Sequence, residues 1–301
     1  MTSLSSPVNA PKAPPFQREM RTYFDRIAPE LPRWQRRNRY YYRDLERLHQ
    51  FLIPPGSRVL EIGCGLGDLL GAVQPEVGVG IDFSEPIVQL ARQTHPQLHV
   101  YCLDAETLHP EQLAPGHQQF DYILLSGVLG YLGDVQTTLS RLHPFCHSRT
   151  RIILAFHNYL WEPLLSFAEA IGQRRPQQAQ SWLSMDDVVN LLNVTGFTPL
   201  KRGRRFLLPK QIPGLSFLVN RYLAPLPIVQ HACLTSYVIA RLHPSLCEPT
   251  PLPSCSVVIP ARNEAGNIRD AIARLPQLGC ETEVIFVEGH SQDHTWDEIQ
   301  A

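Results

Sequence analysis

Several common sequence features are absent from this chain of 301 residues, and each absence excludes a class of protein. The seven cysteines form no C-x-x-C pair and no cluster with histidines at zinc-site spacing. This excludes a disulfide framework and a zinc site, so we expect reduced thiols in a cytoplasmic protein without a metal. The chain starts without the apolar segment of a signal peptide, and it has no run of about eighteen apolar residues that could span a membrane.

The chain also lacks an excess of positive charge, because it contains 27 Lys and Arg residues and 28 Asp and Glu residues. The basic stretch from Arg33 to Arg43 leaves an RNA substrate open in principle. No accessory RNA-binding motif accompanies it, so we expect no nucleic-acid partner.

Composition and periodicity divide the chain into five parts. Residues 1–15 are rich in Pro, Ser and Ala and are predicted to be disordered, and residues 16–52 are predicted to be helical. Residues 53–242 carry an α/β pattern. The proline-rich residues 243–254 indicate a linker, and residues 255–301 open a second β-α-β pattern.

The helical segment 16–52 contains arginines at 33, 36, 37 and 39, followed by Tyr40, Tyr41 and Tyr42. One interpretation is a solvated helix face whose tyrosines pack on the next domain. The other is a lid over an active site that offers Arg and Tyr side chains to an anionic substrate.

Short apolar stretches that alternate with helical ones indicate a parallel sheet buried on both faces. The predicted strands are RVLEIG, VGVGID, LHVYCLD, FDYILLS, RIILAFH, FTPLKRGRRFLLP and LTSYVIARL. Ser84 is the expected N-cap of a helix that continues to Thr94, and Ser184 with Asp187 forms a capping-box pattern.

The segment VLEIGCGLGDLL joins the first strand to a helix through Gly63, Gly65 and Gly67. Such glycines let the backbone turn tightly and approach a ligand beside the helix N-terminus. A dinucleotide fingerprint requires Gly or Ala at the position of Asp68, and Glu61 is out of place in a pyrophosphate cradle. An acidic residue there suits a cationic ligand such as a sulfonium that carries an amino acid.

Two further carboxylates end the next strands. Asp82 ends the second strand, the position from which a carboxylate accepts hydrogen bonds from ribose hydroxyls. Asp104, followed by Ala105 and Glu106, ends the third strand and could accept a hydrogen bond from an adenine amino group.

This pattern, from Glu61 through Asp82 and Asp104 to FDYILLS, resembles the class I S-adenosylmethionine (SAM) dependent methyltransferases over residues 52–242. The resemblance implies a Rossmann-like doubly wound sheet of seven strands, in the order 3-2-1-4-5-7-6, with helices on both faces. It also implies roles in SAM binding for Glu61, Gly63, Cys64, Gly65, Gly67, Asp82, Phe83, Asp104, Ala105 and Ser126. Gly127 departs from the family pattern, because many relatives place Asp, Asn or His there.

Catalytic residues are expected after the fourth and fifth strands, in residues 126–132 and 157–162, because ligands of open α/β sheets bind at the carboxyl ends of strands. His157 is the candidate general base, since an imidazole can accept a proton near neutral pH. The alternative is a hydrogen-bonded structural histidine. Tyr131 and Glu162 are weaker candidates.

The apolar insert at residues 210–232 is interrupted by prolines and carries Lys210 and Arg221. It is interpreted either as a cap on the last strands or as an interfacial element beside a lipid-like acceptor. In the second case the protein would be peripheral to a membrane.

The segments CSVVIPARNEAGNIRDAI and TEVIFVEGHSQDHTWDEI resemble the start of family 2 glycosyltransferases, which have the GT-A fold and include dolichyl-phosphate mannose synthases. Pro260, Ala261, Asn263 and Glu264 match the nucleotide-contacting loop. The Asp-x-Asp metal motif of that family comes later than Ala301. We therefore expect a truncated GT-A fragment that transfers no sugar, belongs with a missing domain or partner, and exposes strand edges.

The sequence thus predicts a methyltransferase that uses SAM to methylate a small molecule, such as a hydroxyl of a glycan, glycolipid or natural product. The alternative is a non-catalytic SAM-binding scaffold for a glycosyltransferase. An NAD(P)-linked enzyme is disfavoured by Asp68 and by the lack of a Tyr-x-x-x-Lys pair.

Overall fold

The computed structural model describes residues 15–175, 177–178, 180–246, 254–276 and 278–301, in two compact units that divide after Glu248. The predicted disordered tail lies outside the described residues except for Pro15, and so does most of the predicted linker. Because the two units are not placed relative to one another, each is described by itself.

A seven-stranded sheet forms the centre of the first unit, in the predicted order β3-β2-β1-β4-β5-β7-β6. The strands are β1 (Arg58–Ile62), β2 (Val77–Asp82), β3 (His99–Cys102), β4 (Phe120–Ser126), β5 (Cys146–His157), β6 (Phe197–Arg205) and β7 (Thr235–Leu242). The first five are parallel, and β7 runs antiparallel to both β5 and β6. The predicted fold class is therefore confirmed.

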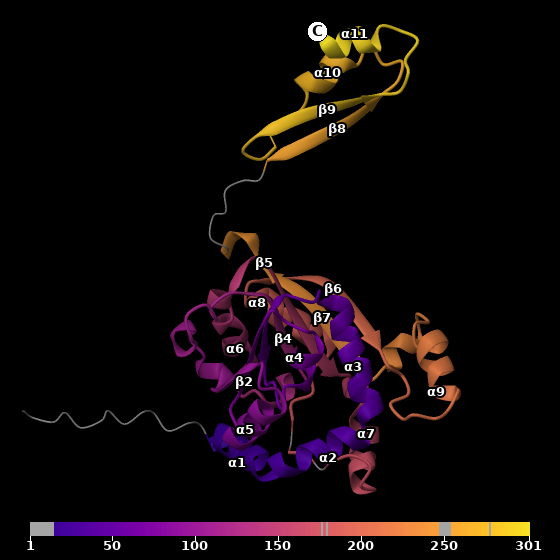
Figure 1. Ribbon diagram of the computed structural model, residues 1–301. Helices are drawn as coiled ribbons and strands as arrows, with labels where there is room; N and C mark the ends of the chain where they lie inside the picture. The colour runs from indigo at the N-terminus through magenta and orange to yellow at the C-terminus, as the bar shows by residue number, and fades with distance from the viewer. Residues whose placement is uncertain (1–14, 176, 179, 247–253, 277) are drawn as a thin grey trace, which may run out of the picture. The chain divides into compact units, whose positions relative to one another are not determined.

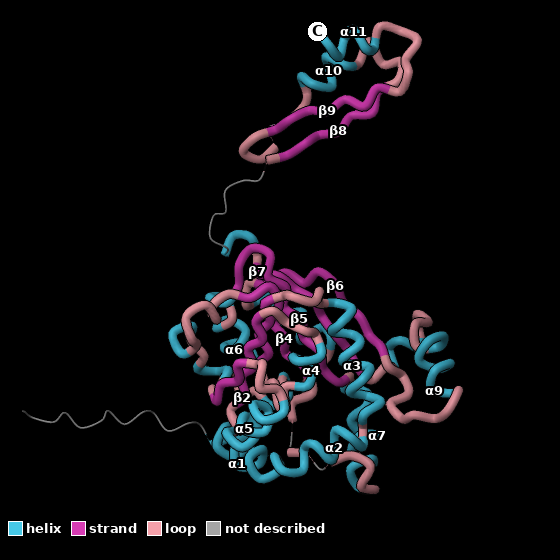
Figure 2. Tube along the Cα trace, viewed as in Figure 1, coloured by secondary structure: helices cyan, strands magenta, loops and turns pink. Residues whose placement is uncertain are grey.

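Helices cover both faces of this sheet (Figures 1 and 2). They include α4 (Asp68–Ala72), α5 (Glu85–Thr94), α6 (Val135–Arg141) and α8 (Met185–Val194). Strand side chains alternate between two cores: Ile123 packs in the core that includes residues of α6 and α8, and Leu124 packs in the core that includes residues of α4 and α5. This period of two leaves every central strand buried on both sides.

The N-terminal helical segment is not one helix but three, α1 (Pro15–Ile27), α2 (Leu31–Arg37) and α3 (Arg39–Leu52). Pro29 and Pro32 explain the breaks after α1, since a proline lacks the N–H that continues a helix and is tolerated only in its first turn. The Asp44 carboxylate in α3 accepts a hydrogen bond of 2.8 Å from Arg205 Nε in β6. The segment is thus attached to the sheet domain.

Two capping predictions have different outcomes. Ser184 and Asp187 form the predicted capping box of α8. Ser84 occupies the N-cap position of α5, but its side chain makes no capping bond. Its hydroxyl donates to Asp25 Oδ1 of α1 instead, at 2.6 Å.

The region after β5 contains α7 (Glu162–Ala170) and, beyond β6, the apolar insert. Strand β6 ends at Arg205 and not at Pro209 as predicted, because Phe206 has a positive φ of 70° that no strand residue adopts. The insert forms α9 (Leu215–Leu218), which continues as a π-helical turn over Val219–Leu223. Within the described residues, no helix is both long and apolar enough to cross a membrane.

The second unit is a small β-α-β-α arrangement. Its elements are β8 (Cys255–Ala261), α10 (Ile268–Ala273), β9 (Thr282–Glu288) and α11 (Thr295–Gln300). The two strands pair in parallel, which is the pairing of a β-α-β unit. Val258, Ile285 and Val287 are exposed, so one face of the pair is open.

Candidate functional site

A cavity of about 610 Å³ lies over the carboxyl ends of the central strands. Its floor includes Glu61 of β1, Asp82 of β2, Ser126 of β4 and His157 of β5. Parallel strands end at the same edge of a sheet, which is where open α/β folds bind their ligands. The cavity therefore lies at the edge of the sheet where the sequence predicted the site.

The glycine-rich loop after β1 forms one wall of the cavity. Gly63 has a φ of +69°, and a Cβ there would lie 2.7 Å from Val128 Cγ2. Gly65 has a φ of +54°, and a Cβ would meet no atom within 4 Å. The loop therefore needs glycine at Gly63 for space and conformation, and at Gly65 for conformation alone.

Asp82 is held against this loop. Its Oδ2 accepts a hydrogen bond of 3.1 Å from the Gly65 N–H, and its Oδ1 accepts one of 3.0 Å from the Ser84 N–H. Burial raises the pKa of Asp82 to about 6, although these hydrogen bonds oppose the rise. Each carboxylate oxygen retains a lone pair for a ligand.

Three polar atoms that line this cavity are buried without a hydrogen-bond partner among the described residues: Glu61 Oε2, Ser126 Oγ and Arg175 Nη1. Burial also raises the pKa of Glu61 well above its usual range. An unsatisfied buried polar group costs about 1–3 kcal/mol and is rare in native proteins. Their convergence on one cavity indicates that a ligand completes their hydrogen bonding.

Not every residue predicted for cofactor binding lines the cavity. Cys64 and Phe83 do, together with the loop glycines Gly63 and Gly65. The other three, Gly67, Asp104 and Ala105, do not line it. Gly67 is the N-cap of α4, and Asp104 Oδ1 accepts a hydrogen bond of 2.9 Å from the Glu106 N–H.

Aromatic rings of α1 and the strand loops close the cavity over Phe83. Phe24 packs edge-on against Phe83 and Tyr131, with centroid distances of 5.5 and 5.2 Å. Burial raises the pKa of Tyr131 to about 12, so its hydroxyl stays protonated at neutral pH. The alternative base Glu162 is exposed and does not line the cavity.

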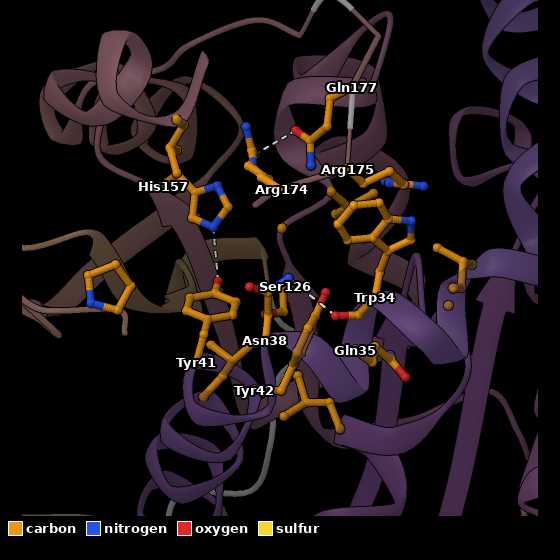
Figure 3. Close-up of a pocket in the computed structure, with 18 of the residues that line it drawn as sticks. Trp34, Gln35, Asn38, Tyr41, Tyr42, Ser126, His157, Arg174, Arg175 and Gln177 are labelled. Atoms are coloured by element: carbon orange, nitrogen blue, oxygen red, sulfur yellow. Dashed lines mark hydrogen bonds between the residues drawn. The ribbon is translucent and has the colours of Figure 1, made fainter. Parts of the chain in front are cut away.

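His157 lies in the cavity next to Tyr41 of α3, with 3.0 Å between Nε2 and the phenolic oxygen (Figure 3). Burial, together with the smaller effect of the nearby Arg174, lowers the pKa of His157 to about 3. The imidazole is therefore neutral at physiological pH and can accept a hydrogen bond from Tyr41.

The segment 16–52 does cover the cavity, but it supplies aromatic, amide and aliphatic side chains and one carboxylate, and none of the four arginines named above. Its contributions include Trp34, Gln35, Asn38, Tyr41 and Tyr42. The cavity arginines are Arg174 and Arg175, which follow α7 (Figure 3). Sequence reasoning missed them, although two adjacent arginines in an otherwise uncharged stretch, QRRPQQAQ, were a visible signal.

Comparison with known proteins agrees with this geometry. A family model described as a methyltransferase domain matches residues 33–202, and one described as glycosyl transferase family 2 matches residues 256–301. No curated protein sequence matches the chain.

Solved structures share the fold at low identity. A SAM-dependent methyltransferase of Thermotoga maritima, described as a possible histamine N-methyltransferase, is 16% identical with a TM-score of 0.56. The match covers 74% of this chain and 99% of that one. A chain from the complex of the Haloferax volcanii Trm112 methyltransferase activator with a methyltransferase is 16% identical over 73% of this chain and 97% of that one, with a TM-score of 0.54.

The methyltransferase model spans more than half of the chain, and the sheet order is the one expected for that fold. The chain therefore belongs to the methyltransferase domain family and is an enzyme of the class I SAM-dependent methyltransferases.

Proposed function

We propose that the cavity holds SAM over β1, β2 and β4. The enzyme then transfers the methyl group to a small-molecule acceptor that enters between β4 and β5. The observation that carries this proposal is the unpartnered, buried Glu61 Oε2 beside the glycine loop. A buried carboxylate with a free oxygen fits a cationic ligand, and the sulfonium and ammonium groups of SAM supply that charge.

Each cofactor residue has a proposed task. Glu61 and the loop glycines would surround the amino-acid part of SAM, and Asp82 would accept hydrogen bonds from the ribose hydroxyls. Phe83 would pack on the adenine, whose amino group would donate to Asp104. Ser126 Oγ, unpartnered in the cavity, would face the methyl-donor end.

SAM supplies an activated methyl group when bound, so the tasks of the protein are orientation, exclusion of water and removal of a proton from the acceptor. The aromatic wall of Trp34, Tyr41 and Tyr42 would orient the acceptor and exclude water. We propose His157 as the group that accepts the acceptor's proton, since it is neutral and lies on the β5 side of the cavity.

The acceptor we propose is a hydroxyl of a glycan, glycolipid or natural product. The match of residues 256–301 to family 2 glycosyltransferases supports a glycan context. The tryptophan and tyrosine rings that line the cavity are suited to stacking on flat or apolar ligand surfaces.

We also propose that residues 210–232 contact a lipid surface. Phe217 and Ile228 are 63% and 87% exposed, and Leu215, Leu218 and Tyr222 are exposed as well. Lys210 and Arg221 accompany them, and the segment contains no Asp or Glu. Apolar side chains with basic residues are typical of elements that lie on anionic membranes.

Calorimetric titration of the purified chain with SAM and S-adenosylhomocysteine (SAH) tests the cofactor proposal. We expect micromolar binding, a loss of at least about tenfold in Asp82→Ala because a hydrogen-bonded charge is removed, and no binding of NAD. A folded wild-type protein that binds neither SAM nor SAH would contradict the proposal.

The alternative of a non-catalytic scaffold makes a different prediction in a second assay. A scaffold would bind SAM without releasing SAH in the presence of any acceptor, whereas an enzyme releases SAH when the correct acceptor is added. An acceptor screen read out by SAH release therefore separates the two functions.

A further inference from the structure

The walls of the cavity carry opposite charges. The carboxylates that line it, Glu46, Glu61, Asp68 and Asp82, come from α3, β1, α4 and β2. Its cations, Arg174, Arg175 and Lys210, come from the segments that follow α7 and β6. The acidic wall suits the cationic groups of SAM, but nothing in the proposed cofactor site uses the basic wall.

The two arginines differ in how they are neutralised. Arg174 forms an ion pair with Glu169, and its Nη2 donates to Gln177 Oε1 at 2.6 Å. Arg175 forms no ion pair with any described residue, and its Nη1 is buried without a partner. Of the two arginines, Arg175 is therefore the one whose charge has no ionic partner among the described residues.

Aromatic contacts hold Arg175 in place. Its guanidinium carbon lies 5.5 Å from the ring centroid of Tyr23 and 5.8 Å from that of Phe24. These cation–π contacts orient the guanidinium but satisfy none of its N–H donors in the plane of the group. A guanidinium held in this way is prepared to donate to a carboxylate or phosphate.

The position of the arginines points to the acceptor. Both influence the ionisation of Tyr131, which follows β4, and Arg174 influences His157 at the end of β5. Strand ends β4 and β5 border the part of the cavity in which we place the acceptor. Trp34 and Tyr42 line the same cavity as the arginines (Figure 3).

We propose that Arg175 is an anion-binding residue of the acceptor site, and that the acceptor carries a phosphate or carboxylate next to an apolar or aromatic portion. This inference rests on the proposed function, because it places the acceptor in the part of the cavity that SAM would not occupy. Arg174, already paired with Glu169, would adjoin the anion and shape the site around it.

The experiment uses the full chain saturated with SAH and three probes: phenyl phosphate, phenylacetate and the neutral 2-phenylethanol. The variants are Arg175→Gln, Arg175→Lys and the control Arg36→Gln, an exposed arginine of α2 that does not line the cavity. Titration is followed by calorimetry, and SAH affinity is measured first for every variant.

We expect the wild type to bind at least one anionic probe about tenfold or more tightly than 2-phenylethanol. The gain in affinity would come from a charge-assisted hydrogen bond between the anion and Arg175. Arg175→Gln should lose about that factor, Arg175→Lys should retain part of it, and Arg36→Gln should bind like the wild type. The stronger of the two anionic probes identifies phosphate or carboxylate as the preferred group.

Three results would overturn the inference. The first is that the anionic probes bind no better than the neutral one, and the second is that Arg175→Gln binds them as the wild type does. Weaker SAH binding in Arg175→Gln, with normal SAH binding in Arg36→Gln, would assign Arg175 to the carboxylate of the cofactor. Failure of the wild type to bind SAH at all is a separate result, which would reject the proposed function together with this inference.

Discussion

His157 and Tyr41 form a hydrogen-bonded pair at the edge of the cavity, and the burial of the imidazole determines how it can act. Burial penalises the charged imidazolium, so the folded-state pKa of about 3 lies below the value of about 6.5 for an exposed histidine. Between pH 5 and 9 the free enzyme therefore holds His157 neutral. The side chain is always ready to accept a proton, although its basicity is low.

Substitution of His157 tests the proposed base. We expect His157→Ala to lower kcat by about a hundredfold, the usual contribution of a positioned proton acceptor, with little change in SAH affinity. The wild-type rate should show no loss from protonation of His157 as pH falls from 8 to 5, because that pKa is about 3. Steady-state rates with the identified acceptor and calorimetry with SAH provide the two measurements.

Tyr41→Phe serves as the matched control, because it removes the hydroxyl that contacts Nε2 and keeps the ring. A pure base role predicts a much smaller effect of Tyr41→Phe than of His157→Ala. Turnover of His157→Ala within a few-fold of the wild type would show that His157 is a structural histidine.

The residues that line the cavity differ in how well the sequence alone predicts them. Glu61, Gly63 and Asp82 were predictable because strand ends and a glycine loop fix their positions in the sheet. Arg174 and Arg175 were not, because they lie in irregular structure between α7 and α8, where no periodicity says which way a side chain points. Arg175, moreover, is positioned by tertiary contacts with Tyr23 and Phe24, which are far away in the chain.

Among the elements, the strands were predictable and the helical insert was not. Strands β1, β2 and β4 are nearly continuous apolar stretches, so burial on both faces could be inferred from composition. The insert has apolar residues without a clear period, and it forms only a short helix and a π-helical turn. Its large apolar side chains are exposed and lie close together in the sequence, whereas a typical surface exposes such side chains singly.

The exposed insert predicts binding to anionic vesicles. We expect the protein to float with phosphatidylglycerol vesicles, and Phe217→Ser combined with Ile228→Ser to weaken this binding by about tenfold or more, since two large apolar side chains no longer enter the lipid. Val194→Ser, which removes a 70% exposed apolar side chain of α8, is the control and should bind normally.

Vesicles of neutral phosphatidylcholine separate the contributions of charge and apolar area. Weaker binding to them would reflect Lys210 and Arg221, as expected for basic residues near a negative surface. Equal and undetectable binding to both kinds of vesicle would reject the lipid contact and favour the cap interpretation of the insert.

The whole molecule combines two units of very different construction. The sheet of the first unit has seven strands and two apolar cores, and Ile123, Leu124 and Leu125 of β4 are fully buried. The second unit has a two-stranded sheet, and side chains such as Val258 and Val287 are more than half exposed. A two-stranded sheet with one open face is marginally stable in water.

This contrast predicts separate local stabilities, which hydrogen exchange of the full chain measures. Amides of β8 and β9 should exchange at least about a hundredfold faster than those of β1 and β4, because opening the second unit exposes little buried surface. SAH should slow exchange in the first unit, whose native state it binds, and leave β8 and β9 unchanged. Protection of β8 and β9 equal to that of β4 would contradict the prediction. If that protection then fell on dilution of the protein, the open face that includes Val258 and Val287 would be covered by a second copy of the chain.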